Sequence, residues 1–310
     1  MKPDIAERNE DSADVSPTYE VGSLVSRVTF VRRIREVTFR LFLYAAIGLA
    51  LGALLAVLAR TWLDGHAKLG SELLSNQPSE RPKRAGIQSG IFGTLWVTGF
   101  CAALTLPLGV CTAVYLEEFA RKERWYNRLI ELNIQNLAAV PSIVYGIVGL
   151  AFIARGPLHW GPTVATAGLI LALVVLPTVV IASREAIRAV PGSLRSGSMA
   201  LGLTRWQTIR KQVMPSAAPG IATGSILAIS RALGETAPLL LLGGLTFLTR
   251  NPASLDDRYT TVPLLIYSYA TSPKDELKQI AAASIIVLMI VLLVLNGAAI
   301  FIRNRFQKRW

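Results

Sequence analysis

The stretch QIAAASIIVLMIVLLVLNGAAIFI, residues 279–302, contains 24 consecutive residues without a charged side chain. An α-helix of about 20 apolar residues is long enough to cross the hydrocarbon core of a bilayer. Ordinary helices of soluble proteins have only about 11 to 12 residues. The chain has five further charge-free stretches of 19 to 32 residues, at 41–59, 85–116, 132–154, 156–183 and 212–230. The sequence therefore predicts an all-α, polytopic membrane bundle of six transmembrane helices.

Composition supports a membrane protein and argues against several functional classes. Apolar residues make up 52% of the chain, charged residues 17%, and the mean hydropathy is +0.45. The only cysteines, Cys101 and Cys111, lie in one apolar stretch, and the only histidines are His66 and His159. Neither set has the spacing of a disulfide framework or a metal site. No glycine is followed by lysine, so the chain lacks a phosphate-binding P-loop. We expect no catalytic residues, cofactor or metal, and any ATP hydrolysis must come from a partner.

The basic residues predict the orientation of the chain in the membrane. The N-terminal tail, the second and fourth connections and the C-terminus together hold 21 Lys and Arg, whereas the other three connections hold 11. Positive charge is retained on the cytoplasmic side of membranes. We therefore expect a multi-pass integral protein of the cell (inner or plasma) membrane, with both termini cytoplasmic. This distribution accounts for the formal charge of +12 without a role in nucleic-acid binding.

The chain divides into a tail and a membrane domain. Its first 40 residues carry seven acidic and seven basic side chains and no apolar core. Such a composition is typical of disorder. We predict a disordered cytoplasmic tail over 1–36 and a transmembrane domain over 37–310, with a cytoplasmic loop at 184–214.

That loop has the pattern of an amphipathic helix. Six basic residues stand against one acid, Glu185. Apolar residues recur at helical spacing, which indicates one apolar helical face; they are Met199, Leu203, Trp206, Ile209 and Val213. Pro215 follows and marks the entry to the next membrane helix. Two interpretations are open: the helix lies on the anionic lipid surface, or it docks into a groove of a soluble partner.

Two charges interrupt the apolar run that follows. Arg231 lies about 24 Å along a helix that starts at Pro215, well inside the bilayer. Glu235, four residues later, shares its helical face. Charged residues at this depth usually have a partner and face a bundle interior or an aqueous cavity. The two interpretations are a structural ion pair, and a site where Arg231 binds a permeating oxyanion while Glu235 orients the guanidinium and neutralises the empty site.

Three motifs carry a family resemblance. The segment SRALGETAPLL at 230–240 resembles the signature of PstA permease subunits of phosphate ABC importers. The segment ALGLTRWQTI at 200–209 resembles the "EAA" loop through which binding-protein-dependent permeases contact their ATPase, and VPSIVYG at 140–146 also matches the family. The resemblance covers about 86–303. The sequence departs from the pattern at Ser196, where the family has Glu, which puts a salt bridge at that position in doubt.

This resemblance implies a type I ABC importer permease fold with six membrane helices. It implies a PstC-like permease partner, a PstB-like ATPase dimer inside, a PstS-like phosphate-binding protein outside, and inorganic phosphate as the solute. The residues carried over to the substrate pathway are Arg231, Glu235 and Thr236. Those carried over to ATPase coupling are Ser196, Ala200, Gly202, Arg205, Trp206 and Pro215.

Other functions remain open at this point. A PstC-like subunit is disfavoured by the Ala-Pro-Leu-Leu ending of the signature. An arginine-lined cavity also suits sulfate, molybdate or phosphonate. An ion-coupled secondary anion carrier would share the buried Arg–Glu pair. A membrane-embedded hydrolase would require a set of reacting side chains that the spans lack.

Overall fold

The computed structural model describes residues 30–121, 123–244 and 247–306. Every element named within these ranges is helical. The chain divides into two units, 1–57 and 58–310, and the boundary falls within helix α1. The α-helices are α1 (Phe30–Gly65), α2 (Ser71–Ser75), α3 (Gln88–Val114), α4 (Trp125–Ala139), α5 (Ser142–Val148), α6 (Val164–Arg188), α7 (Gly192–Ala200), α8 (Arg205–Thr208), α9 (Met214–Gly234), α10 (Ala237–Leu241), α11 (Val262–Ala270) and α12 (Asp275–Phe306). Short 3-10 or π-helical turns adjoin them at η2 (His66–Lys68), η3 (Pro82–Arg84), η4 (Tyr115–Phe119), η5 (Gly149–Ala154) and η6 (Ile209–Val213).

Within the described residues, five helical segments are long and apolar enough to cross a membrane. They are Ile34–Lys68, Gln88–Phe119, Val164–Arg188, Arg205–Gly234 and Asp275–Arg305. The predicted all-α bundle is thereby confirmed, with five such helices, or six if the bent pair described next counts as one span.

The third predicted span, 132–154, is not one straight helix. The helices α4 and α5 meet at a bend of 101°. The bend falls at Val140, which is extended (ψ 129°) and precedes Pro141. A residue before proline is pushed out of the helical region, and proline has no N–H to continue the helix. One proline therefore breaks the span.

The start of the first helix corrects a boundary. We expected a disordered tail over 1–36, but α1 begins at Phe30, so 30–36 are helical. The remainder of the predicted tail, 1–29, lies outside the described residues.

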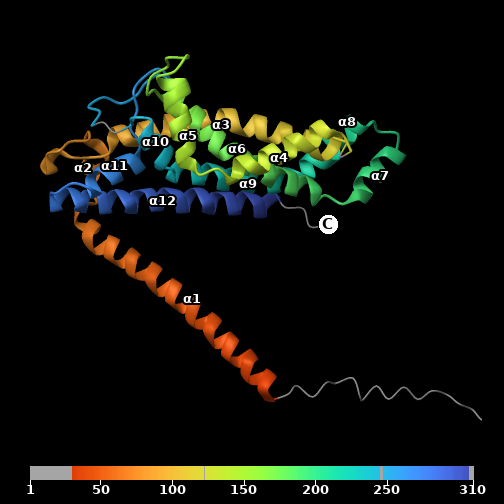
Figure 1. Ribbon diagram of the computed structural model, residues 1–310, viewed down its shortest axis with the longest axis horizontal. Coiled ribbons are helices and arrows are strands. Elements are labelled where there is room, and N and C mark those ends of the chain that lie inside the picture. The colour runs from red at the N-terminus through yellow and green to blue at the C-terminus, as the bar shows by residue number, and fades with distance from the viewer. Residues whose placement is uncertain (1–29, 122, 245–246, 307–310) are drawn as a thin grey trace, which may run out of the picture. The chain divides into compact units, whose positions relative to one another are not determined.

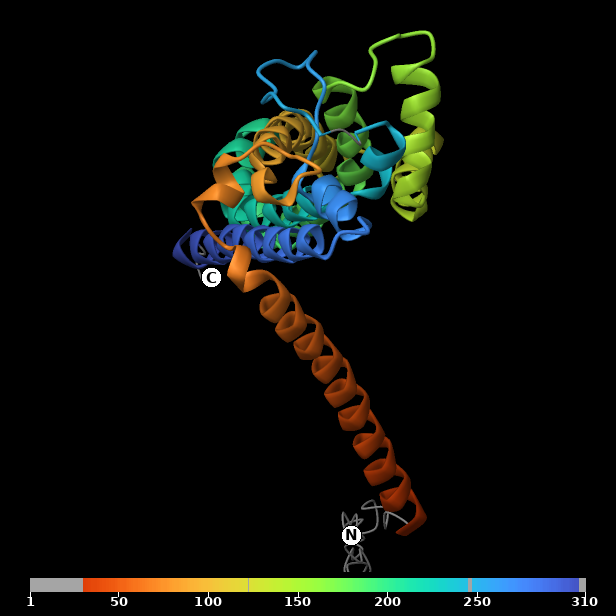
Figure 2. The ribbon, with the colours of Figure 1, turned by 90° about the vertical axis from the view of Figure 1, so that its left-hand side faces the viewer.

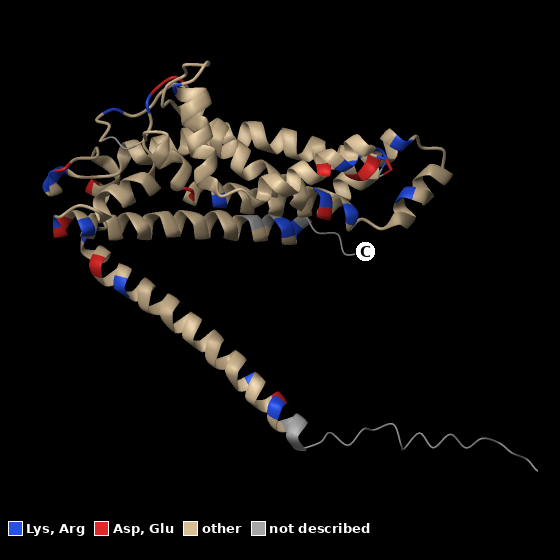
Figure 3. Ribbon diagram, in the orientation of Figure 1, with Lys and Arg blue, Asp and Glu red and all other residues tan. Residues whose placement is uncertain are grey.

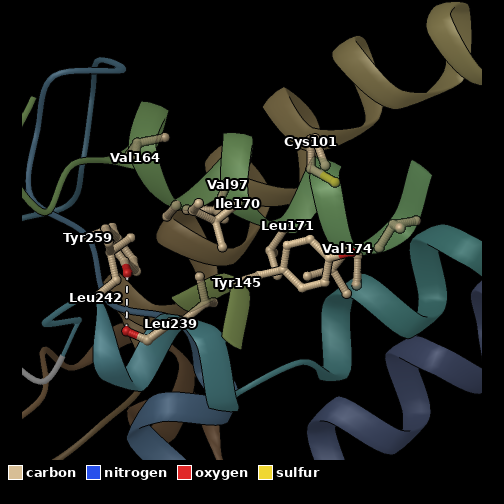
Figure 4. Close-up of a cluster of buried hydrophobic side chains, with 14 of the residues drawn as sticks. Val97, Cys101, Tyr145, Val164, Ile170, Leu171, Val174, Leu239, Leu242 and Tyr259 are labelled. Atoms are coloured by element: carbon tan, nitrogen blue, oxygen red, sulfur yellow. Dashed lines mark hydrogen bonds between the residues drawn. The ribbon is translucent and has the colours of Figure 1, made fainter. Parts of the chain in front are cut away.

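The core of the second unit lies where α3, α6 and α9 pack side by side. Its buried side chains come from these helices, from α5, η5, α10 and α11, and from the chain between α10 and α11. Figure 4 shows Ile170 and Leu171 of α6 between Val97 of α3 and Tyr145 of α5. In this core the Tyr259 hydroxyl donates a hydrogen bond to the Leu239 carbonyl (3.3 Å). The last helix, α12, runs along one side of the unit in both views (Figure 1, Figure 2).

Charged residues gather toward the two ends of this unit along the ribbon, and its middle is mostly uncharged (Figure 3). The short helices α7 and α8 lie at one end, and α2 and α11 lie at the other (Figure 1). This distribution of charge is the one expected of a membrane-spanning bundle, because the apolar middle can face lipid while the charged ends face water.

Candidate functional site

The predicted pair of charges, Arg231 and Glu235, lies at a break between helices α9 and α10. Helix α9 ends at Gly234, and Glu235 has extended backbone angles (φ −72°, ψ 120°) before α10 starts at Ala237. Glycine is a poor helix former, which favours an ending at this point. Arg231 stands in the last turn of α9, where the free carbonyl groups of the helix favour a cation.

The pair forms an ion pair near the end of a membrane helix. Arg231 Nε lies 3.3 Å from Glu235 Oε1. The Arg231 side chain is 56% exposed in this subunit, whereas that of Glu235 is 17% exposed. No hydrogen bond from the terminal nitrogens of Arg231 is found among the described residues. The terminal nitrogens of the Arg231 guanidinium are therefore exposed, whereas its counter-ion, Glu235, is mostly buried.

The third predicted pathway residue, Thr236, lies next to this pair. Its hydroxyl donates a hydrogen bond to the Gly234 carbonyl at 3.4 Å. This contact partly satisfies the backbone where α9 ends, so Thr236 has a local structural role in the break.

Asn296 of α12 lies beside the site and was not among the predicted residues. The Ser230 hydroxyl donates to Asn296 Oδ1 at 3.0 Å and so joins α9 to α12 one residue before Arg231. The available signal was an asparagine well inside the 24-residue apolar stretch 279–302, whose other amide side chain, Gln279, is its first residue.

Two of the predicted motifs lie side by side. The segment 140–146 contributes Gly146 of α5, and the signature segment contributes Pro238 of α10. A β-carbon added to Gly146 would stand 2.7 Å from the Pro238 Cα and 2.7 Å from its carbonyl oxygen. The two broken helices therefore meet backbone to backbone next to the charged pair.

The second site is the turn between α7 and α8. Gly202 has a φ of +84°. Its N–H donates to the Met199 carbonyl (3.0 Å), and the N–H of Leu203 donates to the Ser198 carbonyl (3.2 Å). These two bonds, with a left-handed residue after the helix end, form a Schellman motif. Gly202 fits this position because it has no β-carbon to clash in the left-handed region.

A capping box starts the next helix at once. The Thr204 hydroxyl accepts from the Gln207 N–H (3.3 Å), and the Gln207 side chain accepts from the Thr204 N–H (2.9 Å). The end of α7 and the start of α8 are thus only a few residues apart, and backbone hydrogen bonds together with two side-chain caps define the turn.

This turn overturns the prediction of one amphipathic face over 199–213. The chain turns between Ala200 and Arg205, so residues on its two sides do not share a face. Ile209 and Val213 are buried, whereas Trp206 is 58% exposed. The regular spacing was misleading because Gly202 interrupts the helix that the spacing assumes.

The predicted coupling residues occupy one end of the unit. Ser196 and Ala200 are exposed on α7, Gly202 lies in the turn, and Pro215 is in the first turn of α9. Arg205 and Trp206 begin α8. The structure brings these last two residues together with Phe119 of η4: the Arg205 guanidinium lies 5.3 Å from the Phe119 ring centroid, and the Trp206 ring lies 6.4 Å from it.

Glu117 and Glu118 of η4 also belong to this end and were missed. Arg184 Nε and Arg188 Nη2 contact Glu117 Oε1 at 2.8 and 2.7 Å, and Arg195 Nη2 contacts Glu118 Oε1 at 2.8 Å. Consecutive acids at the end of an apolar stretch, opposite a strongly basic loop, were the available signal. Among the described residues, no three His, Cys, Asp or Glu side chains lie close enough to hold a metal ion.

Comparison with known proteins defines the family. Residues 105–310 match the family described as "Binding-protein-dependent transport system inner membrane component". The chain is 38% identical over 219 residues to the phosphate transport system permease protein PstA 1 of Mycobacterium tuberculosis, and the match covers 70% of each chain. It is 28% identical over 243 residues to the phosphate transport system permease protein PstC of Haemophilus influenzae, covering 71% of this chain and 76% of the relative.

Solved structures share the fold at low identity. A bacterial alginate ABC transporter, in complex with a periplasmic protein that holds an alginate pentasaccharide, matches with a TM-score of 0.65. The identity is 16%, and the match covers 91% of this chain and 99% of that chain. This likeness supports the predicted type I permease fold.

The helical bundle and its relatives define the class: a multi-pass permease subunit of the inner membrane, whose relatives are transporter subunits rather than enzymes. The chain belongs to the family of binding-protein-dependent transport system inner membrane components. The predicted resemblance to PstA permease subunits is confirmed by relatives with 30 to 38% identity.

Proposed function

We propose that this chain is the PstA-like permease subunit of an ATP-driven phosphate importer. The observation that carries the proposal is the Arg231–Glu235 pair, which stands at the break between α9 and α10. The higher identity to the PstA relative than to the PstC relative favours the PstA-like subunit over its partner.

The chemistry of the pair suits an oxyanion. A guanidinium forms bidentate, charge-assisted hydrogen bonds with phosphate oxygens. Glu235 engages Nε only, at 3.3 Å, and so leaves the terminal nitrogens of Arg231 for a solute. When the site is empty, Glu235 neutralises the arginine and lowers the cost of holding that charge within the membrane.

The end of the unit that carries the predicted coupling residues suits contact with a separate ATPase, which would supply the energy for transport. A PstC-like subunit would complete the pathway, and a PstB-like ATPase dimer would contact the turn around Gly202 from the cytoplasm. A PstS-like binding protein would deliver phosphate on the other side. ATP binding favours one of two states of such an assembly, and the solute exchanges sides as the state changes. Both termini of this chain would then be cytoplasmic.

The test is radiolabelled phosphate uptake in cells that lack this protein. The cells are complemented with the wild type, with Arg231→Gln, or with Arg60→Gln. Arg60 is the matched control because it forms another i,i+4 pair, with Asp64 at 3.7 Å, and is 86% exposed. Immunoblots of the membrane fraction verify equal amounts of each variant.

We expect the wild type and Arg60→Gln to restore uptake, and Arg231→Gln to lower it at least about tenfold, because a charge-assisted contact is lost. Normal uptake by Arg231→Gln would remove this residue from the pathway. Rescue of sulfate instead of phosphate would change the solute. Uptake that survives loss of the ATPase but collapses with the proton gradient would indicate a secondary carrier.

A further inference from the structure

The cytoplasmic end of α3 carries a carboxylate that is buried and charged. Glu118 lies in the π-helical turn η4, and its side chain is only 8% exposed. Arg195 of α7 donates to Glu118 Oε1 twice, from Nε (3.0 Å) and from Nη2 (2.8 Å). Removing one partner of such a pair leaves an uncompensated buried charge, whereas a well-packed apolar pair could replace it without loss of stability. Stability alone therefore does not require an ion pair here.

Arg195 also binds the end of α6. Its Nη1 donates to the Val190 carbonyl at 2.7 Å, and its Nη2 donates to the Ile187 carbonyl at 2.8 Å. These carbonyls stand at the C-terminal end of α6, where free acceptors favour a cation. One guanidinium thus joins α7 to both α3 and α6.

Helix α7 packs beside η6 and α8 but buries few of its side chains. Ser198 is its only buried residue, and Leu194 is partly buried against the small core cluster nearby. Because apolar burial is small, the position of α7 depends strongly on the contacts of Arg195.

The helix on the other side of Gly202 is bound to the same turn of η4. Arg205 of α8 donates through Nη2 to the Glu118 carbonyl and stacks over the Phe119 ring at 5.3 Å. Both helices that flank the turn at Gly202 therefore contact Glu118, and α8 also contacts the neighbouring Phe119.

We propose that Glu118 and Arg195 form a transmission clamp, in which displacement of α7 by an ATPase moves the cytoplasmic ends of α3 and α6. Both are positioning residues, and neither touches the solute. The inference rests on the proposed function, because an ATP-driven partner must supply the displacement.

The test compares phosphate transported per ATP hydrolysed by the complete, reconstituted importer. The variants are Glu118→Gln, which removes the charge but keeps the shape, Arg195→Glu, and the double variant Glu118→Arg/Arg195→Glu. The matched control is Glu185→Gln, because Glu185 is 65% exposed and pairs with Arg188 within one helix (3.2 Å).

We expect Glu118→Gln and Arg195→Glu to lower phosphate transported per ATP at least about tenfold, while the control changes it less than about twofold. We expect the double variant to recover at least about threefold over the worse single variant, because the opposite charges still face each other. An unchanged ratio in Glu118→Gln overturns the clamp. A fall in transport with a proportional fall in ATP hydrolysis also overturns it, because such a result indicates a structural role only.

A second measurement tests the clamp even in a variant that does not transport phosphate. It also separates failure of the clamp from failure of the proposed function. Spin labels at Cys111, an exposed cysteine of α3, and at Gly197→Cys on α7, where an added β-carbon meets no atom within 4 Å, report the distance between the helices in the assembled complex. We expect a narrow distribution that is the same with and without ATP, and a broad one in Glu118→Gln. A distance that changes with ATP in the wild type overturns the clamp whatever the solute. Absence of ATP-dependent phosphate transport by the wild type overturns the proposed function instead.

Discussion

Gly146 of α5 and Pro238 of α10 are in such close contact that a β-carbon on Gly146 would lie 2.7 Å from the Pro238 Cα. Real β-carbons essentially never approach backbone atoms this closely. The contact joins the two broken helices of the unit, and Pro238 is three residues beyond Glu235. The position of the charged break therefore depends on a glycine from a distant part of the chain.

Gly146→Ala should therefore destabilise the subunit. Overpacking of a tight contact costs about 1 to 3 kcal/mol, because the neighbouring backbone must shift. The midpoint of thermal unfolding in detergent measures this cost. Gly99→Ala is the control, because Gly99 lies in membrane helix α3 and an added β-carbon meets no atom within 4 Å. Equal midpoints for Gly146→Ala and Gly99→Ala would contradict the close contact.

Arg231→Gln should leave stability nearly unchanged. The pair is an i,i+4 contact with a half-exposed arginine, and such pairs contribute about 0.3 to 0.5 kcal/mol. A structural ion pair and a solute site thus predict different results for the same substitution. Thermal unfolding of the purified complex measures the first, and uptake measures the second. A large loss of stability, more than about 2 kcal/mol, would favour the structural interpretation.

The spans were predictable from the sequence because insertion into lipid depends on a sum of side-chain contributions over about 20 residues. The stretches 85–116 and 279–302 needed no other information. The same sum does not depend on whether the helix is continuous. The apolar stretch 132–154 therefore gave no sign of the bend at Pro141. A single residue without an N–H decides such a break.

The charged pair was predictable because its partners are four residues apart. The partners Glu118 and Arg195 are 77 residues apart in sequence, and local spacing carries no signal for such a pair. Gly202 was assigned from resemblance alone, and the structure supplies its physical reason, a left-handed residue that ends α7.

The loop before α11 provides a prediction about pH. Asp257 Oδ2 accepts from the N–H groups of Ala253 (2.8 Å) and Ser254 (3.0 Å). These backbone hydrogen bonds, with a smaller effect of Arg250, hold the pKa of Asp257 below its ordinary value. A lowered pKa means that the carboxylate stabilises the loop above the ordinary pKa of about 3.9, and that this stabilisation is lost as the pH falls through the lowered value.

Amide hydrogen exchange at Ala253 and Ser254, corrected for intrinsic rates, measures this effect. We expect protection at pH 7 in the wild type, and loss of protection at pH 7 in Asp257→Asn, because the neutral amide is a weaker acceptor. Asp256→Asn is the control, because the adjacent Asp256 is exposed. Full protection in Asp257→Asn would show that the backbone alone holds this loop.

The turn between α7 and α8 distinguishes conformational strain from steric overlap. An added β-carbon meets no atom within 4 Å at either Gly202 or Gly197, so neither alanine substitution creates a clash. Only Gly202 has a positive φ, +84°. An alanine there costs about 1 to 2 kcal/mol, whereas alanine at Gly197, inside α7, should stabilise the helix by up to about 1 kcal/mol. We therefore expect Gly202→Ala to lower both the midpoint of thermal unfolding and phosphate uptake. Gly202→Asn should lower them less, because Asn tolerates the left-handed region. Gly197→Ala should lower neither. If Gly202→Ala and Gly197→Ala behave alike, the backbone at residue 202 is free to adopt an ordinary conformation, and the turn between α7 and α8 is not fixed by its Schellman motif.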